Sequence, residues 1–599
     1  MQFLHKKIIC YHIQIMEKAE KLNNLRHTLA HLLASAVGSI YKFDKVKLTL
    51  GPAIDNGFYY DIDFGEEKIA DKDLRKIEDV MRKNLPKWTE WTHKEITQEE
   101  ALAFFKNEYK AELINEIAGR GEKITTYTCG GFTDLCRGGH LEHPAKEIDP
   151  ESFKLDRVAG AYWRGDEKNK MLTRIYGLAF ETKEELDAYL IQREEAEKRD
   201  HRELGKKLQL FAFDEEIGKG LPIWLPKGNI IKEEIENWAK ETERKWNYQR
   251  VTTPIITKEN LFYTSGHLPL YKESMYAPIC IEEENYYIKP MNCPFHHKVF
   301  SALPRSYKEL PLRLAEYGWC HRYEDSGSLF GMMRVRGMQM NDAHIYVTPE
   351  QAIKEFVDVI KLHEYYYKIL GIEKYEMELS LRDPKKLDKY HGEEEDWRIA
   401  EEMTKKAMEI SGVPFKIVHE GAAFYGPKMD FQIYSSIGRS FTASTNQLDL
   451  YMGKRFKLEY TDKDGSKKTP YIIHRAPLGT HERFIGFLVE HYAGNFPLWL
   501  SPVQVKVIPV RTNHNEYAKE VFEMLKENNI RAELDDAEEN LGGKVRDAKN
   551  NKIPYWIVIG DKEIEANKVT LESRDAGQLG QISKEELLKK LLEEIKNKK

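Results

Sequence analysis

The sequence predicts a protein of several domains that combine α+β and α/β architecture. The chain has 599 residues, about four times the ~150 residues of a typical domain. Strand-like and helix-like patterns alternate along it, without an internal repeat or a low-complexity tract. Hydrophobic residues make up 41% and charged residues 32%, a balance that supports several buried cores and argues against disorder.

Composition also excludes several classes of protein. No uninterrupted apolar run approaches the ~20 residues of a bilayer-spanning helix, so we expect a soluble protein with no membrane partner. Six cysteines are too few for a disulfide scaffold, which favours a reducing compartment, by default the cytoplasm. The net charge of -6 does not predict a nucleic-acid partner, so any such binding depends on local basic patches.

Charge and hydrophobicity divide the chain into five segments. The helical pattern LRHTLAHLLASAV opens a mixed helix and strand unit, and the run KEELDAYLIQREEAEKRDHRELGKK is typical of a solvated connecting helix. A larger unit with many aromatics follows. VQVKVIPV, NEYAKEVFEMLKENN and PYWIVIG then predict a small α/β domain with a partly parallel sheet. The predicted segments are residues 1–22, 23–180, 181–208, 209–501 and 502–599.

Two short motifs in the first unit could form one site. His27 and His31 lie four residues apart, on one side of a helix, although for an isolated pair a structural role is favoured by roughly three to one. FTDLCRGGHLEH places Cys136 and His140 in a glycine-rich segment. The four side chains suit either a tetrahedral zinc site or a metal-free hydrolytic pocket, and spacing does not choose between them.

The segment CHRYEDSGSLFGMMRVRGMQMNDAH indicates a phosphate ligand. Arg322, Glu324, Arg334 and Arg336 surround a Ser/Gly loop, an arrangement suited to an extended polyphosphate. The chain has no GxxxxGK[ST] motif and no strand-borne GxGxxG motif. We therefore expect arginine side chains, rather than a glycine cradle, to hold any bound nucleotide.

Cys293, His344 and His474 form no local motif, because dozens of residues separate them. Taken alone, each is more often a core or turn residue than a ligand. Each nevertheless lies in a segment with unusual chemistry, including arginines that a surface does not require.

A series of motifs gives the chain a close resemblance to the threonyl-tRNA synthetases, which are class II aminoacyl-tRNA synthetases. They are RHTLAH, GPAIDNGFYYD, DLCRGGH, AGAYWRGDEKNKMLTRIYG, IKPMNCP, CHRYEDSGSLFGMMRVRG, NDAHIY, FYGPKMDF, IHRAPLGTHERFIG and FPLWLSPVQV. The resemblance runs from about Leu25 to the carboxyl terminus. It implies ATP-dependent activation of L-threonine and its transfer to tRNA(Thr).

The resemblance also implies the architecture. Residues 23–180 would form an N-terminal α+β editing domain, residues 209–501 a class II catalytic domain around an antiparallel sheet, and residues 502–599 an α/β anticodon-binding domain. A homodimer would pair through the first class II motif, here the stretch that ends at Pro254.

For ATP, the resemblance implies that Arg322 holds the α-phosphate, Glu324 the adenine amino group and Arg334 the γ-phosphate. Arg483, in THERFIG, would stack on adenine and touch the terminal phosphate. Met338 stands where the family usually has a phenylalanine beneath adenine, so we expect weaker ATP binding. Fixed guanidinium groups, with Mg²⁺, would offset the charge that develops as the threonine carboxylate displaces pyrophosphate.

For threonine, the resemblance implies one Zn²⁺ per subunit, held by Cys293, His344 and His474. The amino and hydroxyl groups of threonine would both reach the metal. Valine lacks the hydroxyl, and a site built for that group rejects it by ~10⁴ to 10⁵ in the most favourable cases. The matching pocket residues are Asp342, Tyr425 and Gln447, with Lys428 close by and His267 as a helper in proton removal from the ribose hydroxyl of the tRNA.

Serine differs from threonine by one methyl group, which is worth only ~1 to 3 kcal/mol. The family therefore carries a second, hydrolytic site, which in relatives works without zinc. The resemblance thus implies a metal-free pocket in place of the zinc site considered above, and deacylation of Ser-tRNA(Thr) as its reaction. The residues here that match this site are His27, His31, Lys110, Asp134, Cys136 and His140.

The chain also departs from the family pattern. A small β-grasp domain usually precedes the editing domain, whereas about two dozen residues precede His27 here, and Met16 could be the true start. Glu563, in GDKE, matches a residue associated with anticodon contacts. Glu572 stands where some relatives have an arginine, and we predict that Arg574 substitutes for it.

Three alternatives remain against a threonine-specific enzyme. A prolyl- or seryl-specific relative would not need the three zinc ligands together with this editing domain. A catalytically silent paralogue would have no need for Arg322, Glu324 and Arg483. A zinc hydrolase acting through residues 23–180 alone would reveal itself by its metal content.

Overall fold

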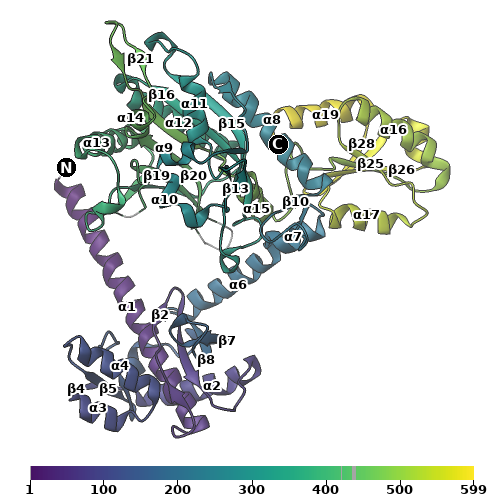
Figure 1. Ribbon diagram of the computed structural model, residues 1–599. Coiled ribbons are helices and arrows are strands. Elements are labelled where there is room, and N and C mark those ends of the chain that lie inside the picture. The colour runs from purple at the N-terminus through teal and green to yellow at the C-terminus, as the bar shows by residue number, and fades with distance from the viewer. Residues whose placement is uncertain (1, 420, 435–439) are drawn as a thin grey trace. The chain divides into compact units, whose positions relative to one another are not determined.

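The structure is a computed structural model that describes residues 2–419, 421–434 and 440–599. Met1, the first residue of the expected extension, lies outside these ranges. The chain divides into two compact units, Met1–Arg193 and Glu194–Lys599 (Figure 1). Among the described residues, no helix is long and apolar enough to cross a membrane.

The first unit combines helices with two small antiparallel sheets. One sheet has the order β1-β3-β8-β7, with β2 paired to β3, and the other has the order β4-β5-β6. Its strands are β1 (Lys47–Leu48), β2 (Ala53–Ile54), β3 (Gly57–Asp63), β4 (Thr92–Glu95), β5 (Thr125–Cys129), β6 (Phe132–Leu135), β7 (Phe153–Tyr162) and β8 (Met171–Ala179). Its helices are α1 (Gln2–Tyr41), α2 (Asp71–Asn84), α3 (Gln98–Phe104), α4 (Glu108–Gly119), α5 (Pro144–Glu147) and most of α6 (Lys183–Arg199).

Helix α1 supplies much of the core of this unit. Leu25, Leu29, Leu32 and Leu33 recur at helical spacing and are buried in one cluster with the inward-facing residues of β3. His31 falls on the same stretch of α1 and is 3% exposed. The apolar packing thereby fixes the helix that carries the predicted histidine pair.

The connecting segment differs from the single solvated helix that the sequence predicts. It forms two helices, α6 and α7 (His201–Lys207), separated by Asp200, whose side chain caps α7 by accepting the backbone N–H of Arg202. His201 and Leu204 in α7 are buried. Because charged residues dominate the segment, its composition does not indicate that this part of α7 is buried.

The second unit is built around an eight-stranded sheet of order β11-β15-β16-β23-β20-β19-β17-β18, antiparallel except at its two edge pairs. These strands are β11 (Gln249–Arg250), β15 (Leu312–His321), β16 (Gly337–Val347), β17 (Tyr375–Ser380), β18 (Phe415–Val418), β19 (Lys428–Tyr434), β20 (Ser440–Asp449) and β23 (Tyr471–Ala476). Smaller strands are β9 (Phe211–Ala212), β10 (Ile223–Trp224), β12 (Ile256–Lys258), β13 (Ile279–Ile281), β14 (Glu284–Ile288), β21 (Tyr460–Thr461) and β22 (Lys467–Lys468).

Helices flank this sheet and complete its core. The largest hydrophobic cluster among the described residues joins residues of α8, α12, α13 and α15 to the sheet strands. These helices have the bounds α8 (Pro226–Lys245), α9 (Asn260–Ser265), α10 (His267–Leu270), α11 (Cys293–Ser301), α12 (Pro349–Ile369), α13 (Glu394–Ser411), α14 (Met452–Arg455) and α15 (His481–His491).

The last hundred residues form the partly parallel α/β domain that the sequence predicts. The strand order is β25-β24-β26-β27-β28, with β24 parallel to both of its neighbours and the other pairs antiparallel (Figure 1). The elements are β24 (Val505–Pro509), α16 (Asn515–Glu527), β25 (Ala532–Leu534), α17 (Leu541–Asn550), β26 (Tyr555–Ile559), α18 (Asp561–Ala566), β27 (Val569–Ser573), β28 (Gly577–Ile582) and α19 (Lys584–Lys596). The predicted mixture of α+β and α/β architecture is confirmed.

Candidate active site

A cavity of about 460 Å³ lies against the eight-stranded sheet of the second unit. It gathers side chains that are far apart in the sequence. Its lining includes nearly all the residues predicted for amino-acid activation, namely Cys293, Arg322, Glu324, Arg334, Met338, Asp342, His344, Tyr425, Lys428, Gln447, His474 and Arg483.

Strand register explains why these residues meet. His344 on β16 pairs with His474 on β23, His474 pairs with Gln447 on β20, and Gln447 pairs with Lys428 on β19. The four residues thus form one row across four antiparallel strands, with neighbouring side chains ~5 Å apart on one face. Asp342 lies two residues before His344 and therefore points to the same face.

The three predicted metal ligands form one buried cluster. Ligand atoms of Cys293, His344 and His474 all lie within 4.8 Å of one another. Nε2 of His344 has no hydrogen-bond partner among the described residues. Nε2 of His474 lies 2.9 Å from Oδ2 of Asp449, so its other ring nitrogen is free to bind a cation, as second-shell carboxylates commonly arrange.

Burial sets the protonation of these ligands. It raises the pKa of the Cys293 thiol well above its usual range, with the nearby carboxylate of Asp342 adding to the effect. Burial also lowers the pKa of His344 well below its usual value, and a neighbouring His474 contributes. A neutral His344 offers a lone pair to a cation, whereas Cys293 must lose its proton when it binds one.

Arginine side chains make the other wall of the cavity positive. Burial lowers the pKa of Arg483, and so do the neighbouring charges of Arg322 and Arg334. Arg334 donates two hydrogen bonds to Oε2 of Glu324, at 3.0 and 2.8 Å. Closely spaced cations that repel one another favour a polyanionic ligand such as a triphosphate.

Two residues that the sequence places near the nucleotide or the amino acid do not line this cavity. Arg336 donates to the backbone oxygen of Glu324 at 2.8 Å and to Oγ of Ser326 at 3.3 Å, so it shapes the loop. His267 is fully buried, and its Nδ1 lies 2.6 Å from Oγ of Ser265. Burial, with the charge of Arg322, lowers the pKa of His267 to about 3, which keeps the imidazole neutral.

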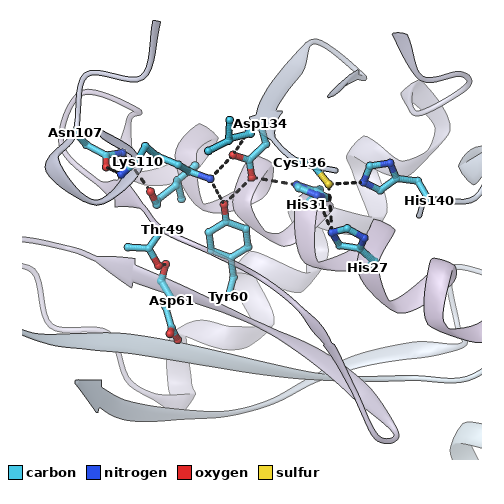
Figure 2. A network of polar contacts seen from close by, with 12 residues as sticks. His27, His31, Thr49, Tyr60, Asp61, Asn107, Lys110, Asp134, Cys136 and His140 are labelled. Carbon is cyan, nitrogen blue, oxygen red and sulfur yellow. Dashed lines mark hydrogen bonds and ion pairs between the residues drawn. The ribbon is translucent and has the colours of Figure 1, made fainter. Parts of the chain in front are cut away.

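A second cavity, of about 360 Å³, lies in the first unit. Helix α1 supplies His27 and His31, α4 supplies Lys110, and β6 and the segment after it supply Asp134 and Cys136. His140 does not line the cavity, but its Nε2 lies 3.3 Å from Sγ of Cys136. Figure 2 shows the six side chains predicted for this site pointing toward one another.

Asp134 is the centre of this network. Its carboxylate lies 2.5 Å from Nζ of Lys110, 2.6 Å from the hydroxyl of Tyr60 and 3.0 Å from Nδ1 of His31 (Figure 2). Burial would raise the pKa of Asp134, but Lys110 and His31 outweigh it and lower the pKa. The carboxylate is therefore charged and orients both basic groups.

Cys136 carries the second negative charge of the network. Burial opposes its ionisation, but hydrogen bonds from His140, His27 and His31 lower the pKa of the thiol to about 3. Burial likewise opposes protonation of His31, while Asp134 and Cys136 raise its pKa to about 9. At neutral pH the pocket holds a thiolate beside an imidazolium, a pair suited to proton transfer.

The same geometry also suits the zinc alternative. Ligand atoms of His27, His31, Cys136 and His140 lie within 4.8 Å of one another. Nδ1 of His27 lies 3.2 Å from the backbone oxygen of Gly139, and such a second partner is usual for a metal-bound histidine. Analysis of metal content distinguishes such a zinc site from the metal-free pocket that the resemblance implies.

Sequence reasoning missed Tyr60 and Trp91, which both contact this network. Tyr60 belongs to the buried face of GFYYDID, and a buried tyrosine hydroxyl needs a partner, so this signal was present. Trp91 stacks on His140, with ring centroids 4.0 Å apart. No local pattern around Trp91 predicts that contact.

The residues predicted for anticodon contacts are engaged in local hydrogen bonds. Glu563 accepts from Thr570, Gln581 and the backbone of Gly560. The guanidinium of Arg574 has a side-chain exposure of 12% and donates to the backbone oxygens of Phe496 and Lys552 as well as to Asp575. Their anticodon role stays a prediction.

Comparisons with known proteins match all three folded regions. The tRNA synthetase class II core domain (G, H, P, S and T) matches residues 276–492, and the anticodon binding domain matches residues 504–594. The threonyl and alanyl tRNA synthetase second additional domain matches residues 124–176. The chain is 46% identical over 582 residues to a threonine–tRNA ligase of Deinococcus radiodurans. The aligned region covers 96% of this chain and 89% of that protein. The chain belongs to the threonine–tRNA ligase family.

Other family members give the same result. A threonine–tRNA ligase of Sulfurihydrogenibium is 48% identical over 97% of this chain and 90% of its own length. Among solved structures, the RNA binding domain of threonyl-tRNA synthetase from Cryptosporidium parvum is 36% identical, with a TM-score of 0.63 over 66% of this chain and 98% of that chain. A putative threonyl-tRNA synthetase from Aeropyrum pernix is 27% identical, with a TM-score of 0.58 over 67% of this chain and 96% of that chain.

Proposed function

We propose that this chain activates L-threonine with ATP, transfers it to tRNA(Thr) and hydrolyses Ser-tRNA(Thr) formed in error. The observation that carries the proposal is the first cavity. It combines a buried Cys293, His344 and His474 cluster with the guanidinium groups of Arg322 and Arg483. A cation site for an amino acid and an anion site for a triphosphate meet there, as adenylate formation requires.

In the ATP site, arginine side chains would bind the nucleotide, and Mg²⁺ would accompany it. Arg322 would hold the α-phosphate and Arg483 the adenine face, while Met338 packs beneath the base. The ion pair of Arg334 with Glu324 would open on binding, so that Arg334 meets the γ-phosphate and Glu324 accepts from the adenine amino group. The partly exposed pair, with side-chain exposures of 52% and 24%, costs little to separate.

In the amino-acid site, the donor set fits Zn²⁺, which prefers sulfur and nitrogen ligands and keeps an open position in sites of this kind. Cys293, His344 and His474 would hold it, and it would supply a Lewis acid that distinguishes a β-hydroxy amine. Asp342 faces the same space and would accept a hydrogen bond from the substrate amino group.

The substrate hydroxyl and the reaction would be served by neighbouring groups. The hydroxyl of Tyr425 donates to Oε1 of Gln447, and this pair would border the threonine side chain. Lys428, whose Nζ lies 2.7 Å from Asp430, would stand near the reacting carboxylate. The neutral His267 would assist removal of the ribose proton in the transfer step.

In the editing site, the thiolate of Cys136 and the imidazolium of His31 would orient a water molecule and the seryl ester. His27 and His140 each contact the sulfur of Cys136 and would stabilise its negative charge. The ester would bind in the second cavity, whose lining includes His31, Tyr60 and Lys110.

We propose the following organisation for the rest of the molecule. Residues 1–22 are an extension, 23–180 the editing domain, 181–208 the linker, 209–501 the catalytic domain and 502–599 the anticodon-binding domain. Glu563 and Arg574 would lie near the anticodon. The cysteines whose side chains are described are all free, which supports a cytoplasmic location.

A homodimer is supported by the surface that follows Pro254. Exposed apolar side chains are frequent in and beside the small sheet β12-β14-β13 and in the helices α9 and α10, and exposed apolar surface of this kind is typical of interaction sites. They are Ile255, Ile256, Tyr263, Leu270, Ile279 and Ile281.

ATP-pyrophosphate exchange with threonine, serine, valine and proline tests substrate and site together. We expect the fastest exchange with threonine, exchange with serine lower by ~10 to 200-fold, and background with valine and proline. Exchange with none of the four would favour a silent paralogue, and exchange with proline or serine alone a relative of other specificity.

Metal analysis tests the ligand assignment. We expect about one zinc per chain, and Cys293→Ala should lose both zinc and threonine activation. Retention of both would refute the assignment. Two zinc ions per chain, with one lost in Cys136→Ala, would favour the metal-binding alternative for the second cavity.

A further inference from the structure

His201, the first residue of α7, is buried and contacts Met332, in the segment that carries the predicted ATP-binding residue Arg334. The ring is 0% exposed and lies outside the first cavity. Its Nδ1 lies 2.7 Å from Oε1 of Glu490 in α15, and its Nε2 accepts a hydrogen bond from the backbone N–H of Met332 at 3.1 Å. Both ring nitrogens are therefore used, with the proton on Nδ1.

Met332 is at the tip of a tight turn formed by residues 330–334. Phe330 and Arg334 exchange two backbone hydrogen bonds of 3.2 Å, and Met333 donates to the oxygen of Phe330 at 2.9 Å. The N–H of Met332 points away from this ladder and is satisfied by His201. Without the imidazole it would be a buried donor with no partner, which costs ~1 to 3 kcal/mol.

The turn fits closely against the ring. Gly331 has a φ of +47°, and a Cβ added there would lie 2.2 Å from Nε2 of His201. The ring of Phe330 lies 5.7 Å from that of His201, and the guanidinium of Arg202 lies over Phe330 at 4.5 Å. A side chain at position 331 would therefore collide with His201, so the close fit of the turn requires glycine there.

Helix α15 also contacts the turn. Arg483, Gly486 and Glu490 lie on one face of this helix, at positions i, i+3 and i+7. Nε of Arg483 donates to the backbone oxygen of Met333 at 3.1 Å, and a Cβ on Gly486 would lie 3.1 Å from Cβ of Met332. The same helix therefore carries an ATP-binding arginine, contacts the turn and orients His201.

A cation site is a weaker explanation of the same group. Asp200, His201 and Glu490 place ligand atoms within 4.8 Å of one another. However, Nε2 of His201 is already an acceptor for Met332, and both carboxylate oxygens of Asp200 accept from Arg202. These contacts leave little free donor capacity for a metal.

We infer that His201 is a positioning residue for ATP. It fixes the turn 330–334 against α15, so that Arg334 and the backbone of Met333 are in place before the triphosphate binds. This inference rests on the proposed function, because it concerns the nucleotide side of the first cavity. The amino-acid side is built from α11 and the sheet strands and does not contact His201.

Two variants of His201 separate the two ring contacts. In His201→Gln the amide oxygen reaches about as far as Nε2 and can accept from Met332. In His201→Asn the shorter amide can still donate to Glu490 but cannot reach Met332. We expect His201→Asn to raise KM for ATP ~10-fold, as loss of one buried hydrogen bond of ~1.4 kcal/mol implies. His201→Gln should stay within about 3-fold of the wild type, and KM for threonine should hardly change in either.

The readouts distinguish positioning from a general loss of structure. ATP-pyrophosphate exchange gives KM for ATP, KM for threonine and kcat, and hydrogen-deuterium exchange of residues 330–334 reports the turn without activity. Zinc content and the midpoint of thermal unfolding serve as controls. Faster hydrogen exchange of this segment in His201→Asn than in His201→Gln would support the inference.

Equal effects of the two variants on KM for ATP, or a parallel rise in KM for both substrates, would overturn it. If His201→Asn does not fold, Glu490→Ala removes the group that fixes the ring and should raise KM for ATP selectively; an unchanged KM would overturn the inference equally. Wild-type protein without exchange for any amino acid would instead refute the proposed function.

Discussion

At the scale of single residues, the second cavity depends on two opposite charges that stabilise each other. The pKa of Cys136 falls to about 3 and that of His31 rises to about 9, in both cases against the effect of burial. The carboxylate of Asp134 holds His31 at 3.0 Å and is itself neutralised by Lys110. Between pH of about 3 and 9 the thiolate and the imidazolium coexist.

This charge state predicts the pH dependence of Ser-tRNA(Thr) deacylation. The rate should be nearly constant from pH ~5 to ~8 and fall as His31 loses its proton near pH 9. The pKa of His31 in the folded protein lies above its ordinary 6.5. Its contribution to stability is therefore complete below pH ~6.5 and is lost as the pH rises through about 9. Rates measured from pH 5 to 10 on supplied Ser-tRNA(Thr) check this profile.

A matched pair of cysteine variants gives the control. Cys136→Ala should slow deacylation at least ~10-fold and leave threonine activation within about 2-fold. Cys129→Ala removes a buried cysteine from the same unit, outside the cavity lining, and should affect stability alone. Equal deacylation by both variants would place the hydrolytic chemistry elsewhere.

Local spacing predicted some of the site residues and the family resemblance predicted others, but distant contacts that neither of them covers were missed. His27 and His31 share a helix face, as their four-residue spacing predicts. His201 lies in a segment of dense charge, and nothing in KRDHREL indicates that its ring meets Met332, 131 residues away. Such a contact depends on tertiary packing, which no local pattern contains.

At the scale of secondary structure elements, the antiparallel sheet converts distant sequence positions into one site. His344, His474, Gln447 and Lys428 could be named from family motifs, but the physical reason they meet is the register of β16, β23, β20 and β19. Register depends on which strands pair, and β16 pairs with β23 although β17 to β22 lie between them in the sequence. Periodicity alone predicts strands and cannot assign their neighbours.

The end of β20 gives a prediction about metal affinity. Oδ1 of Asp449 accepts from the backbone of Tyr451 and Met452, and Oδ2 faces Nε2 of His474. In Asp449→Asn the amide would donate to Nε2, which moves the ring proton to the nitrogen that should bind zinc. We expect zinc affinity to fall ~10 to 100-fold, as measured by competition with a chelator.

Asp430→Asn is the control for this prediction. Asp430 is buried and lines the same cavity, and it pairs with Lys428 rather than with a predicted zinc ligand. Zinc affinity should remain at the wild-type value, whatever happens to activity. A similar loss in both variants would mean that buried charge, rather than the orientation of His474, sets the affinity.

At the scale of the whole molecule, the two predicted reactions belong to units with separate cores. Among the described residues, the cluster built on α1 draws on residues from Leu25 to Ala179, and the cluster on the large sheet draws on residues from Leu204 to Leu500. Sequence composition already indicated several cores, because 599 residues exceed what one core can serve. Sites in separate cores with no shared partners should respond to mutation independently.

The double variant Arg483→Ala with Cys136→Ala tests this independence. Arg483→Ala should reduce ATP-pyrophosphate exchange at least ~100-fold, because a fixed cation that stabilises developing phosphate charge is lost. It should leave deacylation of supplied Ser-tRNA(Thr) within about 2-fold, and each activity of the double variant should equal that of the corresponding single variant. Arg398→Ala, which removes an exposed arginine of α13 paired with Glu395, should change neither activity. Slower deacylation in Arg483→Ala would instead reveal energetic coupling between the two catalytic sites.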